Sequence, residues 1–154
     1  MKVVSISLSE KKGTRKHPMQ RAELIQDHGL KGDAHAGTWH RQVSLLAAEA
    51  IERARNQGID VGFGDFAENI ATIGIDWPKL PVGSIVKIGN DALIQITQIG
   101  KRCHTRCAIY HLAGQCIMPR EGVFARVMKG GEITTGDSIE IIDTPRLSLK
   151  CFRV

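Results

Sequence analysis

The sequence predicts a mainly β fold with few helices, arranged as a small β-barrel with helices on its outside. Many short segments alternate between apolar and polar residues, which is the pattern of half-buried strands. Turn residues separate these segments at close intervals, as in small all-β domains. One segment, residues 47–57, has the spacing of an amphipathic helix instead.

The expected strands are spread along the whole chain. Residues 84–88 and 92–97 form a hairpin across Gly89-Asn90-Asp91, whose residue types favour tight turns. Residues 122–129 are compatible with either a short helix or a strand. The predicted strands cover residues 3–8, 22–26, 42–46, 69–73, 84–88, 92–97 and 138–142.

The helix is predicted from its residue types and from one apolar face. Ala, Glu and Arg are strong helix formers, and Gly58 is suited to end the helix because glycine tolerates a left-handed conformation. The apolar face consists of Ala47, Ala50, Ile51 and Ala54.

Length and composition predict one domain over residues 1–154. No apolar run approaches the roughly 20 residues that a membrane span needs. The first residues alternate like a strand and lack the order of a signal peptide, so we expect a cytoplasmic protein without a membrane partner. The four cysteines are then expected to be reduced thiols rather than disulfides.

The formal net charge is +5, and part of it lies in the basic run over residues 11–17. Such an excess usually marks a solvated basic face. Aromatic residues make up 5% of the chain, and no base-stacking motif accompanies the charge, so nucleic acid is not an expected partner. A small anionic ligand near the cysteines fits better.

Three cysteines, Cys103, Cys107 and Cys116, lie close together after a predicted strand. A thiol acts as nucleophile or metal ligand in its thiolate form, which neighbouring cations favour. Cys103 follows Lys101 and Arg102 directly, so it is the best candidate for a reactive thiol.

Other interpretations of these residues remain open. Structural zinc would need four ligands in close pairs, and no clean second pair completes Cys103 and Cys107. Unreactive buried cysteines are also possible, and Cys151 is assigned to that group. Asp33 and His35 could form a catalytic or metal-binding corner, or a tight turn in which both side chains bond to the backbone.

Several motifs together resemble the MOSC domain, the family named for the C-terminal domain of molybdenum-cofactor sulfurases. The set is specific in this order, although no single piece is. The matching pieces are Gly32-Asp33-Ala34-His35-Ala36-Gly37, Arg41-Gln42-Val43-Ser44-Leu45-Leu46, Phe66-Ala67-Glu68-Asn69-Ile70, Leu80-Pro81-Val82-Gly83, Lys101-Arg102-Cys103, Glu121-Gly122-Val123-Phe124 and Gly136-Asp137.

The resemblance implies a barrel-like β fold and a cysteine that binds the metal of the molybdenum cofactor, molybdopterin, or carries sulfur. That cysteine maps onto Cys103, with Cys107 as second choice. Ser44 and Asn69 resemble positions that hold the cofactor. Cations should surround the cofactor because it carries a phosphate, and sulfur ligands suit its soft metal. The expected cofactor-binding residues are Arg41, Ser44, Asn69, Lys101, Arg102, Asp33 and His35.

One departure from the pattern affects the expected anion contacts. Larger relatives often have Arg-Pro before the asparagine, where this chain has Ala67-Glu68. Either an anion contact is missing, or Arg41 or Arg102 replaces it.

Three classes of function follow from these observations. The protein could be an enzyme, either a sulfurtransferase or a molybdenum-dependent reductase of N-oxygenated compounds. It could instead be a non-catalytic carrier of the cofactor, or a structural zinc module. The expected partners are a cysteine desulfurase or an electron-donor protein, together with proteins of cofactor biosynthesis. The small size favours the carrier or a biosynthetic role.

Overall fold

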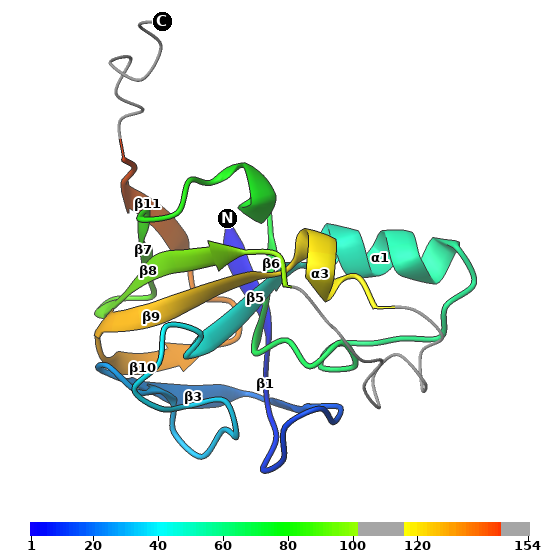
Figure 1. Ribbon diagram of the computed structural model, residues 1–154, viewed down its shortest axis with the longest axis horizontal. Coiled ribbons are helices and arrows are strands. Elements are labelled where there is room, and N and C mark those ends of the chain that lie inside the picture. Colours follow the sequence, from blue (N-terminus) through cyan, green and yellow to red (C-terminus); the bar gives the residue numbers. More distant parts are fainter. Residues whose placement is uncertain (102–115, 146–154) are drawn as a thin grey trace, which may run out of the picture.

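Residues 1–101 and 116–145 are described by the computed structural model (Figure 1). Strands make up most of this part of the chain. In chain order the elements are β1 (Lys2–Leu8), β2 (His17–Met19), β3 (Arg21–Ile25), β4 (Gly29–Leu30), β5 (Val43–Ala47), α1 (Ala48–Asn56), β6 (Ile70–Ile73), η1 (Trp77–Lys79), β7 (Ile85–Ile88), β8 (Ala92–Ile99), α3 (Met118–Glu121), β9 (Val123–Lys129), β10 (Gly131–Thr134) and β11 (Ile139–Asp143).

The described strands form two sheets. The larger has eight strands in the order β11-β7-β8-β9-β5-β6-β1-β2, and the smaller has three in the order β10-β3-β4. Strands β5 and β6 run parallel and are connected through α1, whereas the other paired strands run antiparallel. The parallel pairing places the start of β5 beside the residues that precede β6, and the candidate site lies at this end.

The mainly β prediction is confirmed, but the sheet is not closed into a barrel, so the barrel expectation is not confirmed. Closure would require β11 to pair along the free edge of β1. Part of that edge is taken by β2, which pairs with β1 at Ile6, Ser7 and Leu8. The segment before β11 meets β1 at its beginning, through an isolated bridge between Lys2 and Ser138.

The segments predicted from alternation are present within two residues at each end, and the predicted helix is α1. Residues 122–129, compatible with helix or strand in the sequence, form β9 because β8 and β5 pair with it on either side. The sequence did not indicate β2, β4 and β10. These strands are short and are fixed by distant partners, as when Gly131 pairs with Leu24.

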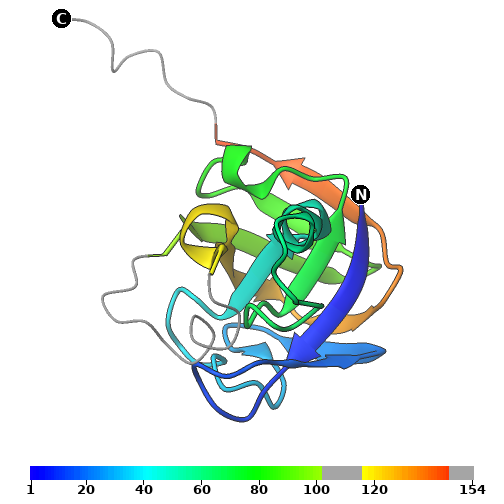
Figure 2. The same cartoon turned by 90° about the vertical axis from the view of Figure 1, so that its right-hand side faces the viewer.

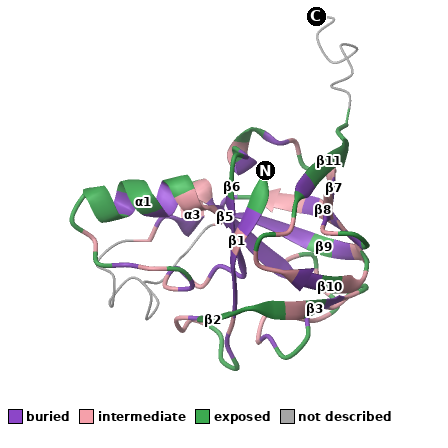
Figure 3. Cartoon of the chain, turned by 180° about the vertical axis from the view of Figure 1, so that it is seen from behind, coloured by how far each residue is buried: buried purple, intermediate pink, exposed green. Residues whose placement is uncertain are grey.

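Strand β5 separates two clusters of core side chains. Successive side chains of a strand point to opposite faces. Leu45 therefore packs in the larger cluster between the sheets, whereas Leu46 packs in a second cluster with Ile51 of α1. Figure 2 looks along α1 and shows α3 beside it. Figure 3 shows that α1 buries one face and exposes the other.

None of the helices among the described residues is long and apolar enough to cross a membrane. Trp77 is fully buried in the larger cluster. Its indole Nε1 donates to Thr72 Oγ1 at 2.7 Å, so the polar end of the ring is also satisfied.

Candidate functional site

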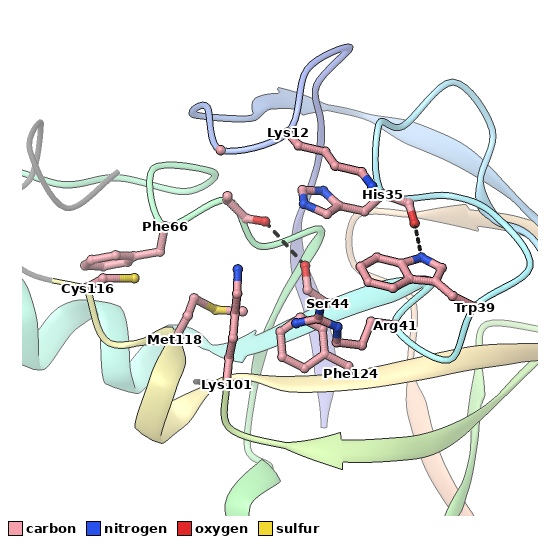
Figure 4. A pocket seen from close by; sticks show the side chains of 12 residues that line it. Lys12, His35, Trp39, Arg41, Ser44, Phe66, Lys101, Cys116, Met118 and Phe124 are labelled. Atoms are coloured by element: carbon pink, nitrogen blue, oxygen red, sulfur yellow. Dashed lines mark hydrogen bonds between the residues drawn. The ribbon is translucent and has the colours of Figure 1, made fainter. Parts of the chain in front are cut away.

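A pocket of about 300 Å³ opens at the end of the sheet where β5 begins (Figure 4). Its apolar wall comes from the core cluster beneath α1, which supplies Phe66, Met118 and Phe124. Its polar groups come from segments far apart in the sequence. The lining residues are Lys12, Gly13, His35, Trp39, Arg41, Ser44, Phe66, Ala67, Lys101, Cys116, Met118 and Phe124.

Ser44 lies in the pocket wall and is held there by Asn69. The side-chain Oδ1 of Asn69 accepts from the backbone N–H of Ser44 at 3.0 Å. The backbone N–H of Asn69 donates to Ser44 Oγ at 3.0 Å, and its Nδ2 donates to the carbonyl oxygen of Ser7 at 3.1 Å. Asn69 is buried and does not line the pocket. It therefore supports Ser44 from behind.

Among the described residues, three cations line the pocket: Lys12, Arg41 and Lys101. The guanidinium of Arg41 lies 4.5 Å from the ring centre of Trp39 and 5.5 Å from that of Phe124. Lys12 Nζ lies 5.0 Å from the Trp39 ring centre. The ring of Trp39 is thus in contact with cations at the pocket.

The Nε atom of Arg41 is buried and has no hydrogen-bond partner in the part of the chain that the structure describes. A buried donor without an acceptor is costly. The aromatic contacts position the guanidinium but accept no conventional hydrogen bond from Nε. Arg41 is therefore a donor suited to an anion in the pocket.

A buried cluster of charged side chains lies behind His35. The side chains of Lys16 and Asp33 are fully buried, and Lys16 Nζ lies 2.7 Å from Asp33 Oδ1. The same nitrogen lies 3.2 Å from Ser9 Oγ and 3.0 Å from His35 Nδ1. The carboxylate of Asp33 also accepts from the backbone N–H groups of Ser9 and His35, each at 3.1 Å. Asp33 therefore fixes the corner that carries His35.

Burial and charge shift the pKa values of this cluster. Burial lowers the pKa of Lys16, although the hydrogen bond and charge of Asp33 oppose the effect. Burial would raise the pKa of Asp33, but Lys16 and the two backbone donors outweigh it and the pKa lies below its ordinary value. Burial, together with the positive charges of Lys16, Lys101 and Lys12, lowers the pKa of His35 to about 4. His35 is consequently neutral near pH 7.

A second buried carboxylate, Glu68, holds the loop that supplies Phe66 and Ala67 to the pocket. Its oxygens accept from the backbone N–H groups of Gly64 and Phe66. Burial raises the pKa of Glu68 to about 7, although these donors oppose the effect. Ala67 adopts a positive φ of 63°, and Ser44 Oγ lies 3.3 Å from its carbonyl oxygen.

The structure brings several of the predicted site residues together. Arg41, Ser44, Lys101 and His35 line one pocket, with Asp33 and Asn69 directly behind it. The predicted Arg102, Cys103 and Cys107 lie outside the described residues, as does Cys151. In the described ranges 1–101 and 116–145, no group of three or more His, Cys, Asp or Glu side chains could hold a metal ion.

Lys16 corrects one interpretation of the sequence. The basic run over residues 11–17 was expected to be solvated, but Lys16 within it is fully buried. No local signal distinguishes it from Lys11 and Lys12, because its partners follow 17 and 19 residues later. Lys12, Glu68 and the aromatic wall were also not predicted as parts of the site.

Sequence comparison decides the family. A sequence model of the MOSC domain matches residues 32–140, more than two thirds of the chain. The chain belongs to the MOSC domain family. The resemblance inferred from the motifs is confirmed, and family membership points to molybdenum-cofactor binding or sulfur chemistry as the general field of function.

Solved structures with the same fold include three named proteins. The chain resembles the YuaD protein of Bacillus subtilis with a TM-score of 0.74 and 17% identity, over 90% of this chain and 93% of that one. It resembles YiiM of Geobacillus stearothermophilus with a TM-score of 0.71 and 19% identity, over 92% and 75% of the two chains.

YiiM of Escherichia coli gives a TM-score of 0.67 and 19% identity, over 94% of this chain and 71% of that one. At these identities the neighbours establish the fold alone. A search of curated proteins found no match.

Proposed function

We propose that the pocket binds the molybdenum cofactor and that Cys103 acts there as metal ligand or sulfur carrier. The observation that carries the proposal is Arg41, whose buried Nε has no hydrogen-bond partner among the described residues and which lines the pocket with Lys12 and Lys101. A phosphate group on the ligand would balance the positive charges of Lys12, Arg41 and Lys101 around the pocket.

The size and the lining of the pocket support such a ligand. Its volume of about 300 Å³ lies at the lower end of the range for small-molecule sites. Phe66, Met118 and Phe124 offer apolar surface for the flat ring system, while the guanidinium of Arg41, which lies 5.5 Å from the Phe124 ring centre, offers donors. When bound, the cofactor would supply a molybdenum centre held by dithiolene sulfurs.

The position of Cys103 in the sequence supports its role. Lys101 lines the pocket, and Cys103 follows it by two residues, a chain length of at most about 7 Å. The cations of the pocket and the adjacent Arg102 favour a thiolate at this place. A thiolate is a suitable ligand for a soft metal and a suitable carrier of sulfur. Cys107 is the second candidate.

The pocket is compatible with the two expected roles in cofactor chemistry. As a carrier, the protein would bind the cofactor and deliver it to biosynthetic partners. As an enzyme, it would pass on sulfur received from a cysteine desulfurase, or reduce N-oxygenated compounds with electrons from a donor protein. In each case Arg41, Lys12 and Lys101 would bind the anionic part of the cofactor, and Ser44 would form part of the wall against which it lies.

Elemental analysis of protein purified from a host that makes the cofactor tests this proposal. We expect stoichiometric molybdenum and pterin in the wild type. Cys103→Ser should lose molybdenum or its transferable sulfur while remaining folded, because a hydroxyl keeps the shape of the side chain but is a hard ligand. Cys151→Ser serves as the matched control and should retain both.

Three results would contradict the proposal. Stoichiometric zinc without molybdenum would support the structural zinc module instead. Equal molybdenum loss in the Cys103 and Cys151 variants would remove the special role of Cys103. Loss of folding in Cys103→Ser, monitored by circular dichroism, would return this cysteine to a structural role.

A further inference from the structure

The buried lysine behind the pocket has one acceptor for each of its protons. Lys16 Nζ lies 2.7 Å from Asp33 Oδ1, 3.2 Å from Ser9 Oγ and 3.0 Å from His35 Nδ1. The hydroxyl of Ser9 donates its own proton to the carbonyl oxygen of Lys11 at 2.9 Å, so its oxygen is free to accept from Lys16. An ammonium group has three donors and no acceptor. Nδ1 of His35 must therefore accept.

This contact determines where the imidazole carries its proton. A neutral imidazole has one protonated and one unprotonated ring nitrogen. His35 is neutral near pH 7 because its pKa is lowered to about 4. With Nδ1 accepting from Lys16, the proton lies on Nε2. Asp33 cannot reverse this arrangement, because its Oδ2 lies 3.8 Å from Nδ1, too far to accept a hydrogen bond from it.

The ring edge that carries Nε2 lies on the pocket side. Lys16, which contacts Nδ1, is fully buried, whereas the His35 side chain is 23% exposed and lines the pocket. Figure 4 shows the ring among the side chains that line the cavity. The charged groups that act on it are Lys16 and Asp33 from behind, and Lys12 and Lys101 from the pocket.

We propose that Lys16 is a positioning residue that fixes His35 as the neutral tautomer with its proton on Nε2, which gives the pocket a permanent hydrogen-bond donor for an oxygen acceptor of an anionic ligand. The anionic ligand rests on the proposed function, whereas the tautomer does not. His35 then acts neither as a base nor as a metal ligand, because both roles need a lone pair on the nitrogen that faces the ligand.

Nitrogen NMR of the histidine rings tests the tautomer in the wild-type protein without any ligand. We expect His35 to show a protonated Nε2 and an unprotonated, hydrogen-bonded Nδ1, unchanged from pH 5.5 to 8.5. A proton on Nδ1, or titration of His35 at its ordinary pKa near 6.5, would overturn the proposal. This measurement does not depend on the folding of a variant.

The variant Lys16→Met combined with Asp33→Asn tests the role of Lys16 without leaving a buried charge unpaired. We expect the Nδ1 hydrogen bond to disappear, the Nδ1–H tautomer to become populated and the pKa of His35 to rise. Lys12→Met is the matched control. It removes a nearby charge that has no hydrogen bond to the ring among the described contacts, so Nδ1 should remain the acceptor. An unchanged His35 spectrum in the double variant would refute the positioning role.

Titration with inorganic phosphate tests the donor. We expect a downfield shift of the Nε2 proton of His35 as phosphate binds. Shifts at Arg41 without a change at this proton would refute the donor contact. If phosphate shifts no resonance of the pocket, the anionic ligand fails together with the proposed function. The tautomer of His35 is measured without ligand, so that result tests the role of Lys16 independently of the proposed function.

Discussion

Two buried carboxylates lie behind the pocket, and they are stabilised in different ways. Asp33 pairs with the ammonium group of Lys16 at 2.7 Å and accepts two backbone N–H bonds. Glu68 accepts backbone N–H bonds from Gly64 and Phe66. The pKa of Asp33 is lowered, whereas burial raises the pKa of Glu68 to about 7.

The different pKa values of Asp33 and Glu68 separate the effect of burial from the effect of a neighbouring cation. Burial by itself acts to raise the pKa of both carboxyls, and backbone donors oppose this effect at both. The direct contact with Lys16 decides the opposite outcome at Asp33. Each carboxylate shapes one wall of the pocket: Asp33 fixes the corner of His35, and Glu68 fixes the loop of Phe66. One wall is thus held by a fixed charge pair, the other by a group that titrates near neutrality.

Removal of the charge on Asp33 should have the largest effect on stability. Asp33→Asn leaves the ammonium of Lys16 buried without its counter-ion, and breaking a buried pair in this way costs about 3–5 kcal/mol. Urea unfolding at pH 7 measures the loss. Lys16→Met combined with Asp33→Asn should recover much of it, because no buried charge is then left unpaired and the side-chain oxygen of the new amide can still accept a backbone N–H.

Glu23→Gln provides the control for this comparison. Glu23 pairs with Lys31 at 3.8 Å, and both side chains are more than half exposed. Exposed pairs contribute about 0–1 kcal/mol. If Asp33→Asn costs no more than Glu23→Gln, the buried pair does not stabilise the corner of His35.

The next largest effect is the pH dependence that Glu68 contributes. A carboxyl with a raised folded-state pKa binds more protons in the folded than in the unfolded state, so its contribution falls as pH rises from 4.5 towards 7. A shift from 4.5 to about 7 corresponds to about 3 kcal/mol across that window. Glu68→Gln should remove this component, measured as the difference between the two unfolding curves at pH 4.5, 6 and 8.

The wild-type and Glu68→Gln curves must be subtracted because the titration of His35 changes the free energy of unfolding in the opposite direction. With a folded-state pKa of about 4, His35 makes stability rise with pH up to its ordinary value near 6.5. Glu132→Gln, at a side chain that is 62% exposed, is the control and should leave the curve unchanged. A Glu68→Gln curve parallel to that of the wild type would contradict the raised pKa.

The third prediction concerns the contact between the segment that carries Lys16 and the loop that Glu68 holds. Lys16 N donates to the carbonyl oxygen of Gly64 at 2.8 Å, and Gly64 N donates to Glu68. A Cβ at Gly64 would overlap the Lys16 carbonyl oxygen, whereas one at Gly58 would meet nothing within 4 Å. Both glycines have positive φ, of 86° and 91°.

Gly64→Ala should therefore cost about 1–3 kcal/mol more than Gly58→Ala, because the overlap adds to a shared conformational strain. Thermal unfolding of the two variants compares them directly. Equal losses would mean that the Lys16 segment and the Glu68 loop are not tightly packed.

The fold was largely predictable because its strands carry strong local patterns. Residues 84–97 contain two alternating runs and a turn, and they form the hairpin of β7 and β8. Strand β2 could not be predicted in the same way. His17, Pro18 and Met19 are all exposed, and the pairing with β1 defines the strand. Closure of a barrel likewise depends on whether the two edge strands of the sheet pair with each other, which no local sequence pattern encodes.

The site residues that belong to the family motif could be predicted from the sequence. Ser44 and Arg41 belong to the same motif as β5, and both line the pocket. The family pattern also indicated that Arg41 or Arg102 could replace a missing anion contact, and Arg41 has the unsatisfied donor. Lys16 and Glu68 could not be predicted as a supporting pair of groups, since their burial depends on contacts between distant loops.

The central claim is that this pocket holds the cofactor, and the pterin content of an Arg41 variant tests it most directly. Arg41→Met keeps an unbranched side chain against Trp39 and Phe124 but removes the donor. Arg53→Met is the control, on the exposed face of α1, with a side chain that is 60% exposed.

Charge-assisted hydrogen bonds contribute about 1.5–3 kcal/mol, so Arg41→Met should bind the pterin at least about tenfold more weakly than the wild type. Arg53→Met should bind it as the wild type does. Equal pterin content in the two variants, with both folded, would contradict the assignment of the cofactor to this pocket.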